Sequence, residues 1–446
     1  MTDTPGIRYY DLRQVSGQST HVDVDMGVIE SAGTTFYNKA VIRVLGPRGW
    51  GILQIDNYTP VSGKKFEDLL ASAEKLALVA DDTVNLGDAP RTIRSVPPVK
   101  EDCRDVSIGE KAELLLAIEK AADRPLVKSR RANYLERIEN VRFMDSSGSE
   151  YSYEICRSGF SVMAVASRNG TVQMGYEPEH TIHGFNLRHR EDMGRKAADM
   201  AVSLLDAGTA KGGKMSAVLD PELAGVLAHE AVGHASEGDL IEEGNSVLMG
   251  KTGEKIGTDL LTIVDDPTLH EFGFEPVDAE GIAVARTEII KAGRVNAFLH
   301  NRQTLAAVGN GVAGHARAMS GEPPLVRMSN TFIETGDATD EDIFSECKNG
   351  IFLAGSRGGQ VDPGRGVFQF NAEYGYLIEN GEKTRMVRDV SLSGEILKTL
   401  HGIILCGKKR VMHSGYCGKG GQSVPVSDGA PLVLLRDAVV GGSGVD

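Results

Sequence analysis

The stretch VLAHEAVGHASEGD, residues 226–239, contains two histidines five positions apart, with a glutamate directly after the first. Shortly before it, Asp220 and Pro221 form a strong helix start. Asp accepts hydrogen bonds from the free backbone amides of a first turn, and Pro fits that turn without strain. We therefore predict a helix that runs from residue 221 to about Gly238.

The spacing of the histidines decides what this helix can do. His229 and Glu230 lie three and four residues after the apolar Val226, on the face expected to be buried. On an ideal α-helix His229 and His234 would point roughly 140° apart, too far for one metal ion. A π-turn would return them to one side, and Gly233 tolerates that distortion. The motif therefore predicts either a metal site or a buried His229–Glu230 pair with His234 near the helix end.

A metal site of this kind needs a third ligand from elsewhere in the chain. The candidates are His300, His315, His401, His413, Glu237 and a cysteine. Cys417 lies in the glycine-rich segment SGYCGKGGQ, and the nearby Lys419 would favour its thiolate. The alternative is that Cys417 is an ordinary small buried residue. Two imidazoles and one thiolate would suit zinc and leave a position for water, with Glu230 as the general base.

Composition excludes several classes of partner. The net charge of −14 disfavours nucleic acid and anionic membranes, and no apolar run reaches the roughly 20 residues of a membrane-spanning helix. The N-terminal residues lack the pattern of a secretory signal. Five scattered cysteines, an odd number, argue against a disulfide framework. We therefore expect a cytoplasmic protein with reduced thiols.

The overall pattern predicts an α+β fold, with an α/β N-terminal region and a β-rich C-terminal domain that contains the H-E-x-x-x-H helix. We divide the chain into residues 1–95, 96–214 and 215–446. Glycine is abundant, 53 of 446 residues, and clusters after residue 230, which favours tight turns between strands.

Local patterns place the individual elements of this fold. We predict a strand hairpin over 39–55, helices over 66–80, 107–123, 190–208 and 339–348, a turn at 169–170, strand–turn–strand units at 288–299 and 375–387, and a linker at 210–214.

Ordered blocks of the sequence resemble the TldD/PmbA peptidase family. The blocks are HEAVGHASEGD (229–239), IVDDP (263–267), DAEGIAVARTEII (278–290), VRMSNTFIETGD (326–337), GGQVDPGRGVFQF (358–370), GYLIENGE (375–382) and YCGKGGQSVPVSDGAP (416–431). The similarity is dense from about residue 220 onward and looser over residues 1–210.

This resemblance implies an active, TldD-like zinc metallopeptidase that acts on short or unfolded polypeptides. It implies that His229, His234 and Cys417 bind Zn²⁺ and that Glu230 activates water. It also implies a dimer, formed either by two copies of the chain or with a TldE/PmbA-like subunit. Two other interpretations stay open: a non-catalytic binding subunit of such a complex, and a zinc amidohydrolase that acts on a non-peptide amide.

Overall fold

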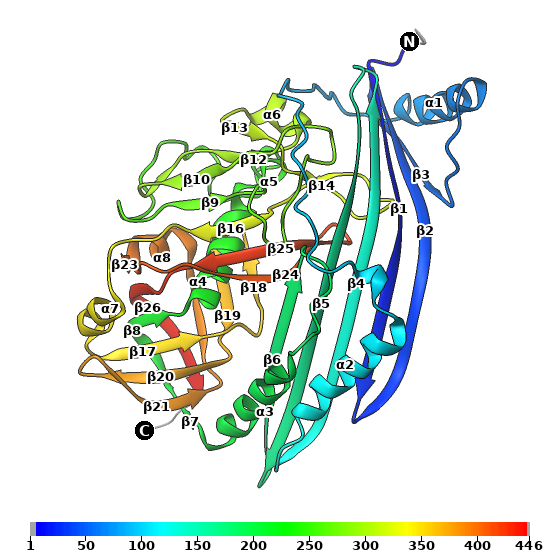
Figure 1. Cartoon of the computed structure of the whole chain (residues 1–446). Coiled ribbons are helices and arrows are strands. Elements are labelled where there is room, and N and C mark those ends of the chain that lie inside the picture. Colours follow the sequence, from blue (N-terminus) through cyan, green and yellow to red (C-terminus); the bar gives the residue numbers. More distant parts are fainter. Residues whose placement is uncertain (1–5, 444–446) are drawn as a thin grey trace.

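The computed structural model describes residues 6–443 and has two parts that lie side by side (Figure 1). The N-terminal part is built on a long, curved antiparallel sheet with the strand order β3-β2-β1-β4-β5-β6. Its strands are β1 (Tyr9–Asp25), β2 (Val28–Gly46), β3 (Gly49–Asp56), β4 (Val127–Asp145), β5 (Glu150–Arg168) and β6 (Thr171–Thr181). The predicted hairpin over 39–55 is the β2–β3 pair, and the predicted turn at 169–170 joins β5 to β6.

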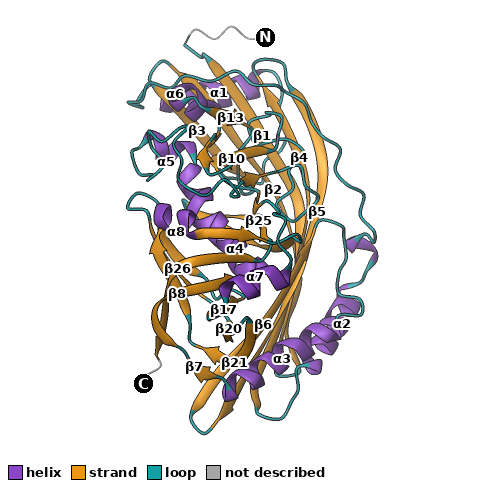
Figure 2. Cartoon of the chain, turned by 90° about the vertical axis from the view of Figure 1, so that its left-hand side faces the viewer, coloured by secondary structure: helices purple, strands orange, loops and turns teal. Residues whose placement is uncertain are grey.

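The two faces of this sheet have different partners, because side chains alternate along each strand. Even-numbered residues such as Ile42 and Val162 are buried under the helices α1 (Lys64–Ala77), α2 (Ile108–Ala121) and α3 (Glu191–Asp206). Figure 2 shows α2 and α3 lying along the sheet. Odd-numbered residues such as Arg137 and Arg157 face the C-terminal part. There they line a cavity together with residues of its loops and of β24 and β25.

The C-terminal part is rich in strands, as predicted. One sheet has the order β18-β19-β22-β26-β8-β17-β20-β21-β7, with β23 paired to β26, and a second has the order β11-β10-β9-β16-β25-β24. The strands are β7 (Gly208–Thr209), β8 (Lys211–Leu219), β9 (Ile263–Asp265), β10 (Thr287–Lys291), β11 (Arg294–Val295), β12 (Phe298–His300), β13 (Gly311–Ala313), β14 (Ala316–Arg317), β15 (Leu325–Val326), β16 (Asn330–Ile333), β17 (Gly350–Ala354), β18 (Gly359–Asp362), β19 (Val367–Asn371), β20 (Tyr374–Glu379), β21 (Glu382–Arg388), β22 (Ser391–Glu395), β23 (Ile403–Cys406), β24 (Val411–Lys419), β25 (Gln422–Ala430) and β26 (Val433–Ser443).

Short helices connect these strands. They are α4 (Pro221–Leu227), a π-helical turn (Ala228–Gly233), a 3-10 turn (His234–Ser236), α5 (Gly238–Glu242), α6 (Arg302–Val308), α7 (Asp340–Cys347) and α8 (Ile396–Gly402), in addition to a 3-10 turn at Cys103–Asp105 in the N-terminal part. The predicted helix over 339–348 is α7, with a capping box between Thr339 and Asp342. The predicted linker at 210–214 is wrong, because β8 begins at Lys211 and pairs with β26 and β17.

A buried ion-pair cluster connects the two parts. Arg43 on β2 donates to the carboxylate of Asp11 on β1 at 3.0 and 2.5 Å, and to Glu280 of the C-terminal part at 3.1 Å. All three side chains are at least nine-tenths buried. Removing one member of such a cluster leaves an uncompensated buried charge, so the cluster fixes the orientation of the sheet against the C-terminal part.

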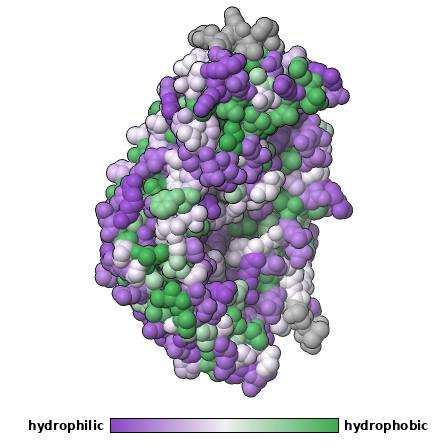
Figure 3. All heavy atoms as spheres, turned by 90° about the vertical axis from the view of Figure 1, so that its right-hand side faces the viewer, coloured by the Kyte–Doolittle hydropathy of each residue, from purple (hydrophilic) through white to green (hydrophobic). Residues whose placement is uncertain are grey.

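The surface is mixed in character. On the face shown in Figure 3, hydrophobic residues form small groups among hydrophilic ones, and the surface is hollowed near its middle. Among the described helices, none has the length and apolar character needed to span a membrane.

Candidate metal centre

The two histidines of the opening stretch lie on one distorted helix. Asp220 accepts a hydrogen bond from the amide of Leu223 at 2.8 Å and so begins α4, as predicted. The helix then widens into the π-turn Ala228–Gly233 and tightens into a 3-10 turn. Because the π-turn adds a residue, the rings of His229 and His234 come within 5.4 Å of each other, centroid to centroid.

Gly233 has a steric reason for being in the motif. A Cβ atom at this position would lie 1.9 Å from Sδ of Met328, which is fully buried beneath the π-turn. Gly225, one turn before His229, is similar, since its Cβ would lie 2.7 Å from the backbone nitrogen of Gly429 on β25. Both glycines therefore allow the helix to pack directly on neighbouring strands.

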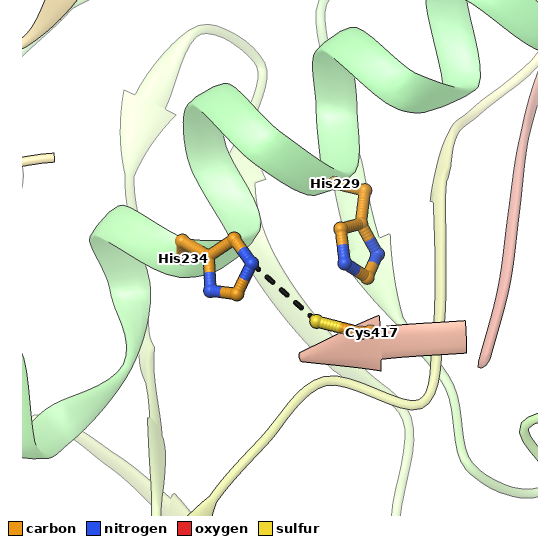
Figure 4. Close-up of side chains that lie close together, drawn as sticks. All are labelled: His229, His234 and Cys417. Carbon is orange, nitrogen blue, oxygen red and sulfur yellow. Dashed lines mark hydrogen bonds between the residues drawn. The ribbon is translucent and has the colours of Figure 1, made fainter. Parts of the chain in front are cut away.

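The hairpin of β24 and β25 brings Cys417 to the two histidines. Cys417 lies in β24, opposite Val424, and its Sγ is 3.4 Å from Nε2 of His234 (Figure 4). One ligand atom from each of His229, His234 and Cys417 can be chosen so that all three lie within 4.8 Å of one another. On the backbone side, the fully buried Arg327 donates to the carbonyl oxygen of Cys417 and so fixes the strand.

The three side chains fit a zinc ion. Bonds of 2.0–2.3 Å to nitrogen and sulfur place tetrahedral ligands roughly 3.5 Å apart, so the observed cluster needs only a small contraction. Two imidazoles and a thiolate are the donor types that zinc prefers. His229 is 3% exposed and its Nδ1 has no hydrogen-bond partner among the described residues. The other ring nitrogen of His229 lies on the side of His234 and Cys417, so the ring presents a donor atom to the cluster (Figure 4).

Electrostatics favour the thiolate that metal binding requires. Burial alone would raise the pKa of the Cys417 thiol, but hydrogen bonds from His229 and His234 outweigh burial and lower that pKa to about 4. Burial also opposes protonation of the imidazoles. Even so, the pKa of His229 is raised, mainly by Cys417, and the pKa of His234 is raised by Glu237 and then Cys417. Cys417 is therefore ionised at neutral pH, and binding of a cation displaces protons from the histidines.

A buried carboxylate lies behind His234. Glu237 is 0% exposed, and its Oε2 lies 3.1 Å from Nδ1 of His234. Lys419 donates to the same Oε2 at 3.0 Å and to Asp239 at 2.7 and 2.8 Å. A carboxylate that accepts a hydrogen bond from Nδ1 holds the ring with Nε2 aimed at Cys417, which is how proteins orient metal-binding histidines.

Lys419 and the candidate third ligands other than Cys417 do not contact the cluster in the way the sequence suggested. We expected Lys419 to favour the thiolate directly, but its ammonium group contacts Glu237, Asp239 and a backbone carbonyl instead. Glu237, a candidate third ligand, lies on the far side of His234 from Cys417. Elsewhere, His300 contacts Thr304 and Gly309, His315 contacts Thr287 and Asp265, and neither His401 nor His413 belongs to the cluster.

Glu230 is next to the three side chains but is more accessible. Its side chain is 33% exposed, whereas that of His234 is 13% exposed. Its Oε2 lies 3.8 Å from Nε2 of His234. The carboxylate therefore lies at the solvent-accessible side of the cluster, where it can reach water and a substrate.

Comparison with known proteins identifies the family. The models of the PmbA/TldA metallopeptidase domains match along most of the chain: domain 1 over residues 10–80, the central domain over 101–205 and the C-terminal domain over 212–442. The chain belongs to the PmbA/TldD metallopeptidase family. The resemblance inferred from the sequence blocks is therefore confirmed.

Relatives within this family are named as metalloproteases. A metalloprotease of Archaeoglobus fulgidus is 40% identical over 98% of this chain and 100% of its own length. A zinc metalloprotease TldD homolog of Saccharolobus solfataricus is 29% identical over 90% of this chain and 89% of its own length. The crystal structure of TldE from Thermococcus kodakarensis has a TM-score of 0.75 at 19% identity, over 96% of this chain and 97% of that one. The predicted α+β fold is thus confirmed.

The contact between Glu237 and His234 generates a testable prediction. Glu237→Gln removes the charge that holds the Nδ1 proton and leaves Lys419 short of a partner, so zinc affinity should fall about 10–100-fold. The matched control is Glu242→Gln on α5, whose glutamate is exposed. Competition with a chromophoric chelator measures both affinities. Equal affinity in the two variants would show that Glu237 does not orient the histidine.

Proposed function

We propose that this protein is a zinc-dependent metallopeptidase that hydrolyses peptide bonds in short or unfolded polypeptides. The observation that supports the proposal is the convergence of His229, His234 and Cys417, from segments almost 190 residues apart, with Glu230 beside them. The zinc named for the Saccharolobus solfataricus relative agrees with this donor set. His229, His234 and Cys417 would hold the ion.

Each residue has a distinct part in the proposed hydrolysis. A zinc ion bound by the three ligands would supply Lewis-acid chemistry, which polarises a carbonyl group and acidifies water. Glu230 accepts a proton from the attacking water and returns it to the nitrogen of the leaving amine. Glu237 keeps the His234 ring in one orientation while Glu230 changes its protonation.

The joint presence of all four residues argues against a non-catalytic binding subunit. A binding role would need neither a thiolate held against two imidazoles nor an accessible carboxylate beside them. The free thiols of Cys103, Cys156, Cys347, Cys406 and Cys417 support the proposed cytoplasmic location, where thiols stay reduced.

Replacing the proposed base tests the mechanism most directly. Glu230→Gln removes the proton acceptor but leaves the three ligands, so hydrolysis should fall roughly 10²–10⁴-fold while zinc content stays at one per chain. Cleavage of an unfolded casein substrate and elemental analysis measure the two quantities. Glu243→Gln, at an exposed position beyond α5, is the control. Cleavage by Glu230→Gln at the wild-type rate would exclude this residue as the base.

Two cysteine variants test the third ligand. Cys417→Ser should lower zinc occupancy and abolish hydrolysis, because a neutral hydroxyl replaces a thiolate. Cys406→Ser should retain zinc, since Cys406 is buried in the core and burial raises its pKa to about 12. Metal analysis of both variants beside the wild type separates them. Full occupancy in Cys417→Ser, or an equal loss in both, would contradict the assignment.

We also propose that the protein works as a dimer, with a second copy or with a TldE-like subunit. The fold that this chain shares with TldE supports a TldD/TldE-type assembly. Multi-angle light scattering of the purified chain should give a mass of about twice 47.8 kDa. A stable monomer would exclude the homodimer, and co-expression with a TldE-like chain would then test the heterodimer.

A further inference from the structure

A second polar site lies between the two parts of the molecule. A cavity of about 320 Å³ is lined by odd-numbered residues of β1, β2, β4 and β5 and by residues of the loop after β14 and of the β24–β25 hairpin. Five of its lining side chains are cationic, namely those of Arg13, Lys39, Arg137, Arg157 and Arg317, and two are carboxylates, those of Glu139 and Glu275. In a chain with a net charge of −14, this is a marked local excess of positive charge.

Lys39 pairs with Asp56 at 3.3 Å, and the carboxylates of the cavity contact only some of the arginines. Glu275 contacts both Arg157, at 3.1 Å, and Arg317, at 2.9 Å. Glu139 accepts a hydrogen bond from the hydroxyl of Tyr37 at 2.7 Å. Across residues 6–443, neither Arg13 nor Arg137 has a carboxylate partner. Arg13 donates instead to the backbone carbonyl of Met319 at 3.3 Å, so two guanidinium groups of the cavity form no ion pair among the described residues.

The register of the sheet places like charges against each other. Arg137 on β4 lies directly opposite Arg157 on β5. The Arg157 side chain is 10% exposed, and its Nε has no hydrogen-bond partner in the described part of the chain. Like charges directly across an antiparallel pair destabilise a sheet. An anion bound between the two strands would remove the repulsion and supply the missing acceptor.

The cavity is adjacent to the metal centre. Tyr416, which lines the cavity, immediately precedes Cys417 in β24. Consecutive residues of a strand point to opposite faces, so Cys417 faces the histidines while Tyr416 faces the cavity. β24 is the outermost strand of its sheet, and the ring of Tyr416 contacts that of His180 on β6. Because Tyr416 and Cys417 are consecutive residues, the cavity and the metal centre lie on the two faces of the same strand.

We propose that this cavity binds a carboxylate of the peptide substrate and so selects peptides with a negative charge a few residues from the cleaved bond. The inference rests on the proposed peptidase function and specifies its substrate class. Arginine suits this task because its planar group donates two parallel hydrogen bonds to a carboxylate. The carboxylate is either an acidic side chain or the C-terminus of the peptide, which have the same chemistry.

Calorimetric titration of the full-length, zinc-loaded Glu230→Gln protein tests the proposal without requiring cleavage. The probes are alanine-based octapeptides that each contain one Glu, at a different position in each peptide. Every peptide is compared with a counterpart that has Gln in place of Glu. Each is also made with a free and with an amidated C-terminus. At one Glu position, or with the free C-terminus, binding should be about 10-fold tighter than with the uncharged counterpart. Which of the two arms responds identifies the source of the carboxylate.

Second-site variants in the Glu230→Gln background complete the test. Arg137→Gln should abolish the preference for the charged peptide, and Arg137→Lys should restore part of it. Arg131→Gln, which alters an exposed arginine of the same strand outside the cavity, should keep it. Equal binding of every charged and uncharged pair, or equal loss in Arg131→Gln and Arg137→Gln, would overturn the inference. Cleavage of casein by the wild type decides the peptidase function separately.

Discussion

The candidate site depends on one local constraint, the π-turn at Ala228–Gly233. Histidines five positions apart diverge on a regular α-helix, and the extra residue in this turn is what makes them converge. A π-turn is unfavourable by itself, so the surrounding packing must stabilise it. Met328 fills the space that a side chain at position 233 would need, and β25 lies directly against Gly225. The convergence of the ligands thus follows from close packing around two glycines.

Charge around the site is arranged in layers. The thiolate of Cys417 lies against both imidazoles, the Glu237 carboxylate lies behind His234, and the ammonium of Lys419 lies behind Glu237. Each of these four groups therefore has an opposite neighbour, which is the condition for keeping charged groups out of water. Lys419 is two residues from Cys417 in the same strand, so a single hairpin supplies both a candidate ligand and the outermost charge of the series.

The sequence predicted the features that depend on local chemistry. The cap at Asp220, the capping box of α7, the turn at 169–170 and the need for a π-turn all follow from neighbouring residues. The glycine-rich surroundings of Cys417 made it a candidate third ligand among several, and the resemblance then implied it as the ligand. The role of Lys419 was misjudged, since Glu237 and Asp239 lie 182 and 180 residues away in the sequence. The supposed linker at 210–214 contains two glycines but is stabilised as β8 by partners near the C-terminus.

The pairing of β1 with β4 has a consequence for how the protein can be divided. The family describes separate first and central domains, over residues 10–80 and 101–205, yet residues 11–25 of β1 pair continuously with residues 131–145 of β4. Deleting the first domain would leave β4, a strand of 19 residues, with one unpaired backbone edge. An edge of that length is a template for pairing with other chains. The first domain thus covers this edge of the central one, and a cut between the two domains exposes it.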